Sequence, residues 1–556
     1  MVDEVVSGSP SEAAHESEPS PLFSLPDEAA VSDSPKKPWN TERRQSRRRH
    51  GLFVFACLYT FLFIGAFYGW GPMQLMLEEN GTFSSKCDGY DFDENDSSDD
   101  ICPAQSSALV NVHFYANMMQ MASPLFGLLL DRYGPVFTAY LMAIIGWIGL
   151  TLLILATSYS DVMLYPAFQL MGLSTFLGAM LMIHTGMVFA EGNRMRQRVI
   201  ITLNAMFDAG SITWLGLWAI DKGTSGSFTL SNLLTMYLVC SVLIFGTGLY
   251  LWTVVEPEQA ITNVEDDEEG EEEEKSTKSD ADEVVPDTKA ENDASIQEES
   301  KSEMLPSDEA KPVASHAGSV SKSIAPQDTY ILVRDRTFRQ QIVSLPFGAF
   351  VVFWTIAVTY NQYILTTTRD FLAFLGDDET GNKYLTIFTL LMPASLVAVP
   401  FTDETLEKIG FHGGFQAING MGLAFSLIRL LSDNLNVQVI GFVLFSFWRS
   451  FLFGVSFSFF PTLLSPSVVG KATGIVYALT GATAFLNVPI TDYAIEEKGG
   501  DFFIPNLIYT CLIGVCVLAA WYLGKVNRRE KHILETRRRS SVVAASQSSL
   551  NFSFVQ

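Results

Sequence analysis

The sequence lacks the motifs on which the common classes of enzyme and ion pump depend. It contains no phosphate-binding loop, no paired-cysteine metal site and no Gly-x-Ser-x-Gly nucleophile turn. Only 6 cysteines and 7 histidines occur in 556 residues. We therefore expect no catalytic residue, no metal and no cofactor. We also expect no cleavable signal peptide, because the first apolar run begins only after about fifty mostly polar residues.

Apolar surface is what the sequence has in excess. Hydrophobic residues make up 48% of the chain, 41 of them are Phe, and the mean hydropathy is +0.22. One soluble core cannot hide that much apolar surface. The composition therefore predicts an integral membrane protein whose main partner is the lipid bilayer.

Negative charge is concentrated in one segment. The formal net charge is -25, and 23 acidic residues against 6 lysines lie between Glu256 and Asp328. Such a polar tract buries too little apolar area to offset the entropy of ordering, so we predict a disordered cytoplasmic linker over 256–340. We expect the same of the N-terminus, 1–50, and of the tail, 526–556. The acidity argues against nucleic acid as a partner.

Twelve apolar runs are long enough to cross a bilayer, and they fall into two sets of six on either side of the acidic segment. The runs lie near 52–77, 107–130, 136–157, 162–189, 198–220, 232–254, 341–364, 384–400, 411–431, 436–460, 471–490 and 502–524. We therefore predict an all-α membrane protein with twelve transmembrane helices, arranged as an N-terminal six-helix bundle over 51–255 and a C-terminal one over 341–525.

The distribution of Lys and Arg predicts the orientation. Basic residues cluster before the first run, between the fourth and fifth runs and after the last one, whereas the alternate connections hold only scattered cations. Cytoplasmic loops carry such an excess, so we expect both termini in the cytoplasm. We expect the plasma membrane as the location, with a vacuolar or lysosomal membrane as the alternative. The oligomeric state stays open.

The first outer loop, 78–106, carries signals of an oxidising compartment. Cys87 and Cys102 are the two cysteines outside the apolar runs, and we predict that they form a disulfide; two free thiols are the alternative. Asn80 and Asn95 begin acceptor sequences for glycosylation in the same loop.

A short turn after the second run combines small and charged residues. Gly127 permits close approach of a neighbouring backbone, and Asp131 is suited to face the positive end of another helix. Arg132 can pair with an acid across the inner surface, and Gly134 closes the turn. The sequence therefore predicts a contact between helices on the cytoplasmic side.

Two sets of six spans with this Gly-x-x-x-Asp-Arg-x-Gly turn resemble the major facilitator superfamily of transporters. The resemblance implies that the turn formed by Gly127, Asp131, Arg132 and Gly134 is an inner latch of the outward-facing state. This chain departs from the family pattern because Pro135 and Val136 stand where further basic residues are usual.

Four stretches resemble solute carrier family 43 more narrowly. They are Tyr68-Gly-Trp-Gly-Pro72, Asn204-Ala-Met-Phe-Asp208, Arg449-Ser-Phe-Leu-Phe453, and Gly474-Ile-Val-Tyr-Ala-Leu-Thr-Gly481 with Asn487-Val-Pro489. The resemblance implies sodium-independent facilitated diffusion of large neutral amino acids. A proton-coupled transporter, a carrier of nucleobases or other small organic solutes, and a nutrient sensor that moves nothing remain as alternatives.

Two ionisable residues lie deep in predicted spans, where charge is costly and usually functional. Arg449 can receive a substrate carboxylate through its forked guanidinium. Asp208 can accept an ammonium group, with Asn204 one turn earlier in the same network. The alternative reading is a structural ion pair between Arg449 and Asp208.

Other candidates are polar or small residues inside the spans. Asn361 and Gln362, after Tyr360, are candidates for binding polar substrate atoms. Glycines followed by Pro72 can expose backbone groups where a helix is broken, and close helix packing is the alternative; these are Gly65, Gly69 and Gly71. A polar stripe on the second span is expected to serve helix packing, with proton transfer by its histidine as the alternative; it consists of His113, Asn117 and Gln120.

Overall fold

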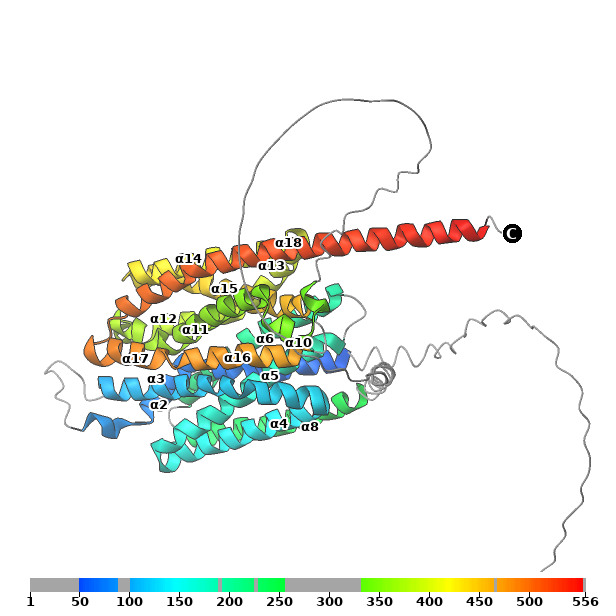
Figure 1. Cartoon of the computed structure of the whole chain (residues 1–556). Helices are drawn as coiled ribbons and strands as arrows, with labels where there is room; N and C mark the ends of the chain where they lie inside the picture. The colour runs from blue at the N-terminus through cyan, green and yellow to red at the C-terminus, as the bar shows by residue number, and fades with distance from the viewer. Residues whose placement is uncertain are drawn as a thin grey trace, which may run out of the picture. The chain divides into compact units, whose positions relative to one another are not determined.

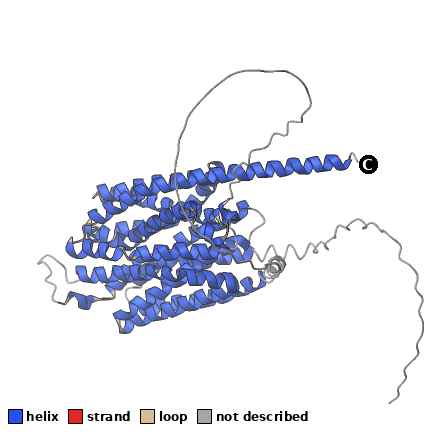
Figure 2. Cartoon of the chain, viewed as in Figure 1, coloured by secondary structure: helices blue, strands red, loops and turns tan. Residues whose placement is uncertain are grey.

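The computed structural model describes residues 50–88, 101–188, 193–224, 229–255, 332–464 and 468–553. All regular secondary structure in these ranges is helical (Figures 1 and 2). Asn95, residues 1–49 and most of the predicted linker, 256–331, lie outside the described residues.

Twelve membrane crossings can be counted in the described ranges. Eleven helices there are long and apolar enough to cross a membrane, and one of them, Pro103–Tyr159, has 57 residues. At about 1.5 Å per residue it is long enough for two crossings. The backbone at Gly134 has φ of 78°, which interrupts the helix between two apolar stretches. The predicted twelve-helix membrane fold is therefore confirmed.

The first half of the molecule contains six crossings. Its elements are a helix over 50–59, η1 (Thr60–Ile64), η2 (Gly65–Tyr68), α2 (Trp70–Glu79), η3 (Ser84–Cys87), α3 (Pro103–Met118), η4 (Met119–Ala122), α4 (Ser123–Tyr159), η5 (Asp161–Met163), α5 (Leu164–Val188), α6 (Asn193–Ala209), α7 (Ile212–Gly223) and α8 (Leu230–Val255).

The second half contains the other six. Its elements are η6 (Val333–Asp335), α10 (Phe338–Ile342), α11 (Leu345–Phe374), η7 (Asp378–Thr380), α12 (Lys383–Leu391), η8 (Met392–Ala394), α13 (Ser395–Lys408), α14 (Phe411–Leu431), α15 (Leu435–Leu463), α16 (Val469–Ala484), α17 (Asn487–Asp492), η10 (Tyr493–Glu497) and α18 (Phe503–Ser553).

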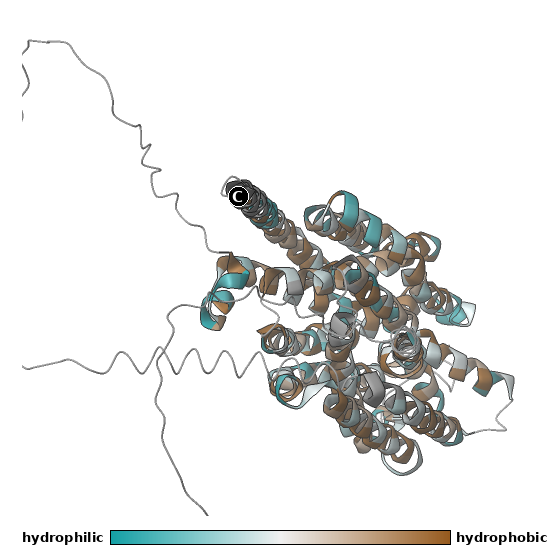
Figure 3. Ribbon diagram, turned by 90° about the vertical axis from the view of Figure 1, so that its right-hand side faces the viewer, coloured by the Kyte–Doolittle hydropathy of each residue, from teal (hydrophilic) through white to brown (hydrophobic). Residues whose placement is uncertain are grey.

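The helices pack side by side, and their outward surface is apolar. Figure 3, which looks along the bundle, shows mainly hydrophobic ribbon with polar segments concentrated at helix ends. Large side chains such as Leu243 and Leu518 are 65% and 70% exposed. Apolar side chains exposed in this number mark a surface that faces lipid.

Several spans are broken where they pass the centre of the bundle. The first span narrows to the 3-10 helix η2 and leaves helical geometry at Gly69, whose φ and ψ are -82° and 42°. The fifth span breaks between α6 and α7. The eighth is interrupted at η8, which contains Pro393, a residue without a backbone N–H to donate. Broken helices leave backbone groups available to a site in the membrane.

Three boundaries differ from those that we predicted. Helix α11 continues to Phe374 instead of ending near 364, so Asn361 and Gln362 lie near its middle. Helix α18 continues through 526–553, where we expected a disordered tail; its Lys, Arg and Glu residues favour helix, and an existing helix is extended more easily than a new one starts. The described residues resume at Leu332, within the predicted linker, and the backbone N–H of Val333 donates to Glu530 Oε1 on α18 over 3.1 Å.

Candidate functional site

A buried ion pair joins the two halves of the bundle. Arg449 Nε on α15 lies 2.7 Å from Asp208 Oδ1 on α6, and each side chain is only 1% exposed. The contact is outside hydrogen-bond angles, so the polar atoms of both side chains lack a hydrogen-bond partner among the described residues. The guanidinium also lies 4.8 Å from the ring centre of Tyr68. The structure thus brings together the two charged candidates from the sequence.

Three buried amide side chains have no hydrogen-bond partner among the described residues. They are Asn204, Asn361 and Gln362, each at most 1% exposed. Asn204 lies one helical turn before Asp208, and Asn361 lies one turn before Leu365. An unsatisfied buried amide costs about 1–3 kcal/mol, so these groups are available to water or to a polar solute.

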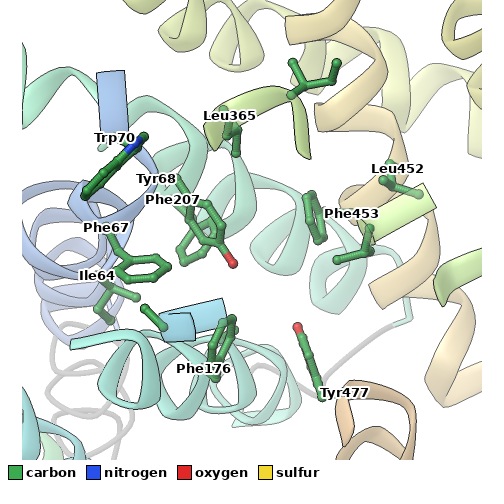
Figure 4. Packing of buried hydrophobic residues seen from close by; sticks show 14 of the residues in the cluster. Ile64, Phe67, Tyr68, Trp70, Phe176, Phe207, Leu365, Leu452, Phe453 and Tyr477 are labelled. Atoms are coloured by element: carbon green, nitrogen blue, oxygen red, sulfur yellow. The ribbon is translucent and has the colours of Figure 1, made fainter. Parts of the chain in front are cut away.

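Aromatic side chains from both halves line the centre. Figure 4 shows the hydroxyl groups of Tyr68, from the first half, and Tyr477, from the second, pointing toward the same space. Phe207 packs against Tyr68 with ring centres 5.2 Å apart, and Phe176 packs against Tyr477 at 6.2 Å. The pair formed by Arg449 and Asp208 therefore lies beside large aromatic rings, some of which carry a hydroxyl group.

The predicted helix break at the glycines is present, and two of the glycines pack tightly. A Cβ on Gly65 would meet the backbone oxygen of Phe207, and one on Gly69 would meet that of Ser211. A Cβ on Gly71 would lie 2.8 Å from Leu385 Cδ1. Close packing therefore requires glycine here. A small cavity of about 10 Å³ also lies at the break, lined by Tyr68, Gly69, Trp70, Gly71, Pro72, Ser211, Leu365, Thr368, Leu385, Phe388, Thr389 and Met392.

The polar stripe of α3 lies at the contact with α11. His113 Nδ1 is 2.6 Å from Thr366 Oγ1, and its ring stacks on Trp70 with centres 4.9 Å apart. Asn117 donates to the carbonyl of His113 over 2.9 Å, and Gln120 donates to that of Asn117 over 3.1 Å. All three stripe residues are fully buried. The stripe therefore joins the two halves and leaves His113 Nε2 without a partner among the described residues.

An ionic cluster that the sequence reading missed closes one end of the interface. Arg369 Nε lies 3.1 Å from Glu78 Oε2, and Arg369 Nη2 lies 3.3 Å from Asp378 Oδ1. Ser106 Oγ and Gln74 Nε2 donate to Asp370 over 2.5 and 3.2 Å. The predicted seventh span ends near 364, which places Arg369 in the connection that follows it. The apolar Leu365, Phe371 and Leu372 were the available signal that the helix continues.

Burial dominates the electrostatics at this end. It raises the pKa of Glu78 from 4.5 to about 7, although Arg369 acts in the opposite direction. The side chain of Glu78 is 4% exposed. The contact between α2 and α11 therefore includes a carboxyl group that titrates near neutral pH.

The Gly127–Gly134 turn contacts the start of α16 at the opposite end. A Cβ on Gly127 would lie 2.7 Å from the carbonyl oxygen of Gly470, and Asp131 Oδ1 lies against Gly470 itself. Asp131 thus faces a helix N-terminus, as we predicted from its charge. Arg132 differs from our expectation, since it lies over the ring of Tyr133 at 5.5 Å and makes no ion pair within the described residues.

An ion pair lies at the same end as this turn. Arg198 Nε on α6 is 2.9 Å from Asp403 Oδ2 on α13, so the fifth and eighth spans are also joined there. The described halves are therefore in contact at both ends.

The disulfide predicted in the first outer loop is present. Cys87 and Cys102 are bonded, with their Cα atoms 5.7 Å apart. Asn80 is exposed at the end of α2, and its glycosylation stays a prediction. Within the described residues no group of three or more metal-ligating side chains occurs.

Comparisons with known proteins support the fold. No protein-family model matches the chain, and no curated protein matches it in sequence. The structure is similar to that of the human organic anion transporter MFSD10 (TETRAN), with a TM-score of 0.51 and 12% identity over 86% of this chain and 99% of that one. It is also similar to the proton:xylose symporter XylE bound to 6-bromo-6-deoxy-D-glucose, with a TM-score of 0.55 and 12% identity over 86% and 96%. The chain therefore has the fold of the major facilitator superfamily transporters.

Proposed function

We propose that this protein is a membrane transporter that carries large neutral amino acids by sodium-independent facilitated diffusion. In this proposal the two halves rock about a central site and expose it to each side in turn. We further propose that both termini are cytoplasmic and that the end carrying the Cys87–Cys102 disulfide faces outward. The first described helix, over 50–59, and the C-terminal part of α18 lie toward the same end of the bundle (Figure 1).

The pair formed by Asp208 and Arg449 is the observation on which the proposal depends. A zwitterion carries the same two charges, so its ammonium group can replace Arg449 beside Asp208 while its carboxylate takes the forked guanidinium. The aromatic faces of Tyr68, Phe207 and Tyr477 suit a large apolar side chain. Asp208 lies in the first half and Arg449 in the second. A solute bound between these two charges would therefore contact both halves.

Contacts at the two ends of the interface supply the gates that alternating access needs. Glu78 and Arg369 close one end, and Asp131 against α16 closes the other. Opening either end requires the corresponding contact to break while the other persists. The structure, with both closed, corresponds in this proposal to an occluded intermediate.

Counterflow in liposomes tests the proposal. Purified full-length protein is reconstituted with unlabelled leucine inside and labelled leucine outside, without a sodium or proton gradient. We expect transient accumulation of label, and its loss in the Asp208→Asn variant. Glu404→Gln is the matched control, because it removes an exposed acid whose partner, Lys408, lies on the same helix, and it should retain exchange. Strict dependence on either gradient would contradict facilitated diffusion.

The unpartnered amides favour one alternative solute. Asn204, Asn361 and Gln362 offer the donor and acceptor pairs that recognise nucleobase edges. A panel of neutral amino acids, charged amino acids and nucleobases as competitors separates these solutes. Saturable binding of a competitor without any flux would instead indicate a sensor.

A further inference from the structure

A third buried arginine lies away from the central pair. Arg429 on α14 is only 3% exposed. Its Nε donates to Asn506 Oδ1 over 3.1 Å, its Nη2 to Thr367 Oγ1 over 3.2 Å, and its Nη1 to Thr368 Oγ1 over 3.5 Å. Its guanidinium carbon lies 4.0 Å from the ring centre of Phe371. These contacts hold the guanidinium in one place.

All of these partners are neutral. No carboxylate of the described residues lies within ion-pair distance of Arg429. The other two buried arginines differ in this respect, since Arg369 and Arg449 have carboxylate oxygens at 3.1 and 2.7 Å. Arg429 is therefore a fixed, buried positive charge without a counter-charge in the described part of the chain.

Such a charge is costly, and arginine cannot lose it. A buried ion needs a partner of opposite charge or it destabilises the protein strongly. A lysine would release its proton, whereas a guanidinium stays protonated in proteins. Aromatic and hydroxyl contacts offset part of the cost, and a cation–π contact contributes about 0.5–2 kcal/mol. The contacts of the described residues leave the rest of that cost without a compensating negative charge.

We propose that Arg429 is the centre of an anion site, in which the hydroxyls of Thr367 and Thr368 are further ligands for one small monovalent anion, either a halide or a small carboxylate. The water-sized cavity at the helix break is lined by Thr368, so it lies next to the site. Both hydroxyls now accept from the guanidinium and donate to backbone carbonyls of α11. They can turn to donate to an anion. The site is distinct from the pair at Asp208 and does not depend on the transported solute.

The chemistry of the site limits its occupant to a single charge. One guanidinium surrounded by neutral groups balances one negative charge, and a dianion would leave a buried charge unpaired. A carboxylate can take two parallel N–H donors, and a halide can take the same donors with less directional demand. We therefore expect both chloride and acetate to bind, and sulfate to bind poorly.

Thermal unfolding of the purified full-length protein tests the proposal without any flux measurement. The melting temperature is followed at constant ionic strength while a bulky sulfonate is replaced by chloride, acetate or sulfate. We expect chloride and acetate to raise the melting temperature saturably, as ligands of the folded state do. In Arg429→Gln the response should disappear, with apparent anion affinity at least roughly tenfold weaker, the scale of a hydrogen bond to a charged group.

Arg198→Gln is the matched control, because it removes a half-exposed guanidinium whose counter-charge, Asp403, is present in the chain. It should keep the anion response of the wild type. Thr367→Val with Thr368→Val should weaken the response if Arg429→Gln fails to fold. A wild-type protein whose melting temperature is equal in sulfonate, chloride and acetate would overturn the proposal, as would an unaltered response in Arg429→Gln. Neither result would affect the proposed transport of amino acids.

Discussion

Arg369 on α11 lies 3.1 Å, through Nε, from Glu78 Oε2 on α2, and this ion pair joins the two halves at the end of the bundle that carries the disulfide. Arg369 belongs to a helix, α11, whose length the apolar pattern understated. The stability of the contact between α2 and α11 therefore depends on the protonation of the Glu78 carboxyl group.

We predict that this end opens more readily as the pH rises. The pKa of Glu78 is about 7 in the closed contact, above its ordinary 4.5, because burial outweighs the effect of Arg369. The closed contact therefore binds the proton more tightly than the open one. Its stabilisation is complete below pH 4.5 and is lost as the pH rises through about 7. A single cysteine is placed at this end of the interface, and its labelling rate is divided by that of a fully exposed reference cysteine to remove the effect of thiolate formation. This ratio should increase over the window.

The Glu78→Gln variant provides the control for this prediction. A glutamine keeps the size of the side chain but does not titrate, so the ratio of the two labelling rates should become independent of pH between 4.5 and about 7. A persistent pH dependence in this variant would assign the effect to another group, such as Asp370.

We predict that Arg449→Ala abolishes transport and destabilises the protein. Removal of one partner leaves Asp208 buried and unpaired, which costs about 3–5 kcal/mol. The double variant with Asp208→Ala removes both charges and should recover most of the thermal stability without recovering counterflow. If the double variant were no more stable than Arg449→Ala, the two residues would not be energetically coupled.

We predict that Asp131→Asn weakens the contact with α16. An acidic side chain at a helix N-terminus contributes about 0.3–2 kcal/mol, so its loss changes the ratio of conformers by roughly 2- to 30-fold. Exchange should slow while leucine affinity is retained. Cysteine labelling at this end of the bundle measures the shift. Unchanged labelling together with unchanged flux would mean that this turn has no latch function here.

We predict that Gly65→Ala impairs folding. The added Cβ would meet the backbone oxygen of Phe207, which has no flexible side chain to move aside, and overpacking costs about 1–3 kcal/mol. Gly216→Ala is the matched control on α7, where a Cβ meets no atom within 4 Å. Thermal unfolding in detergent should show a lower melting temperature for the first variant alone. Equal melting temperatures would indicate that α6 moves away at little cost.

The sequence by itself determined the class of fold and several local roles. Twelve apolar runs in two sets of six predict the membrane topology, because a span needs about 20 apolar residues and this requirement is local. The contact that Gly127 and Asp131 make with another helix also followed from local chemistry, whereas the latch role of their turn stays a prediction. The pairing of Cys87 with Cys102 followed from their position outside the apolar runs.

Only the tertiary structure decided which groups meet. Asp208 and Arg449 are far apart in the chain. The hydrophobic pattern does not predict that α6 and α15 are in contact at the position of these two residues. The charges of Glu78 and Asp370 near Arg369 were hidden because our seventh span ended too early. Arg429 lies inside a predicted span, but only the structure shows that the groups in contact with its guanidinium are neutral. Helix formation depends on neighbours in sequence, whereas the balance of a buried charge depends on neighbours in space.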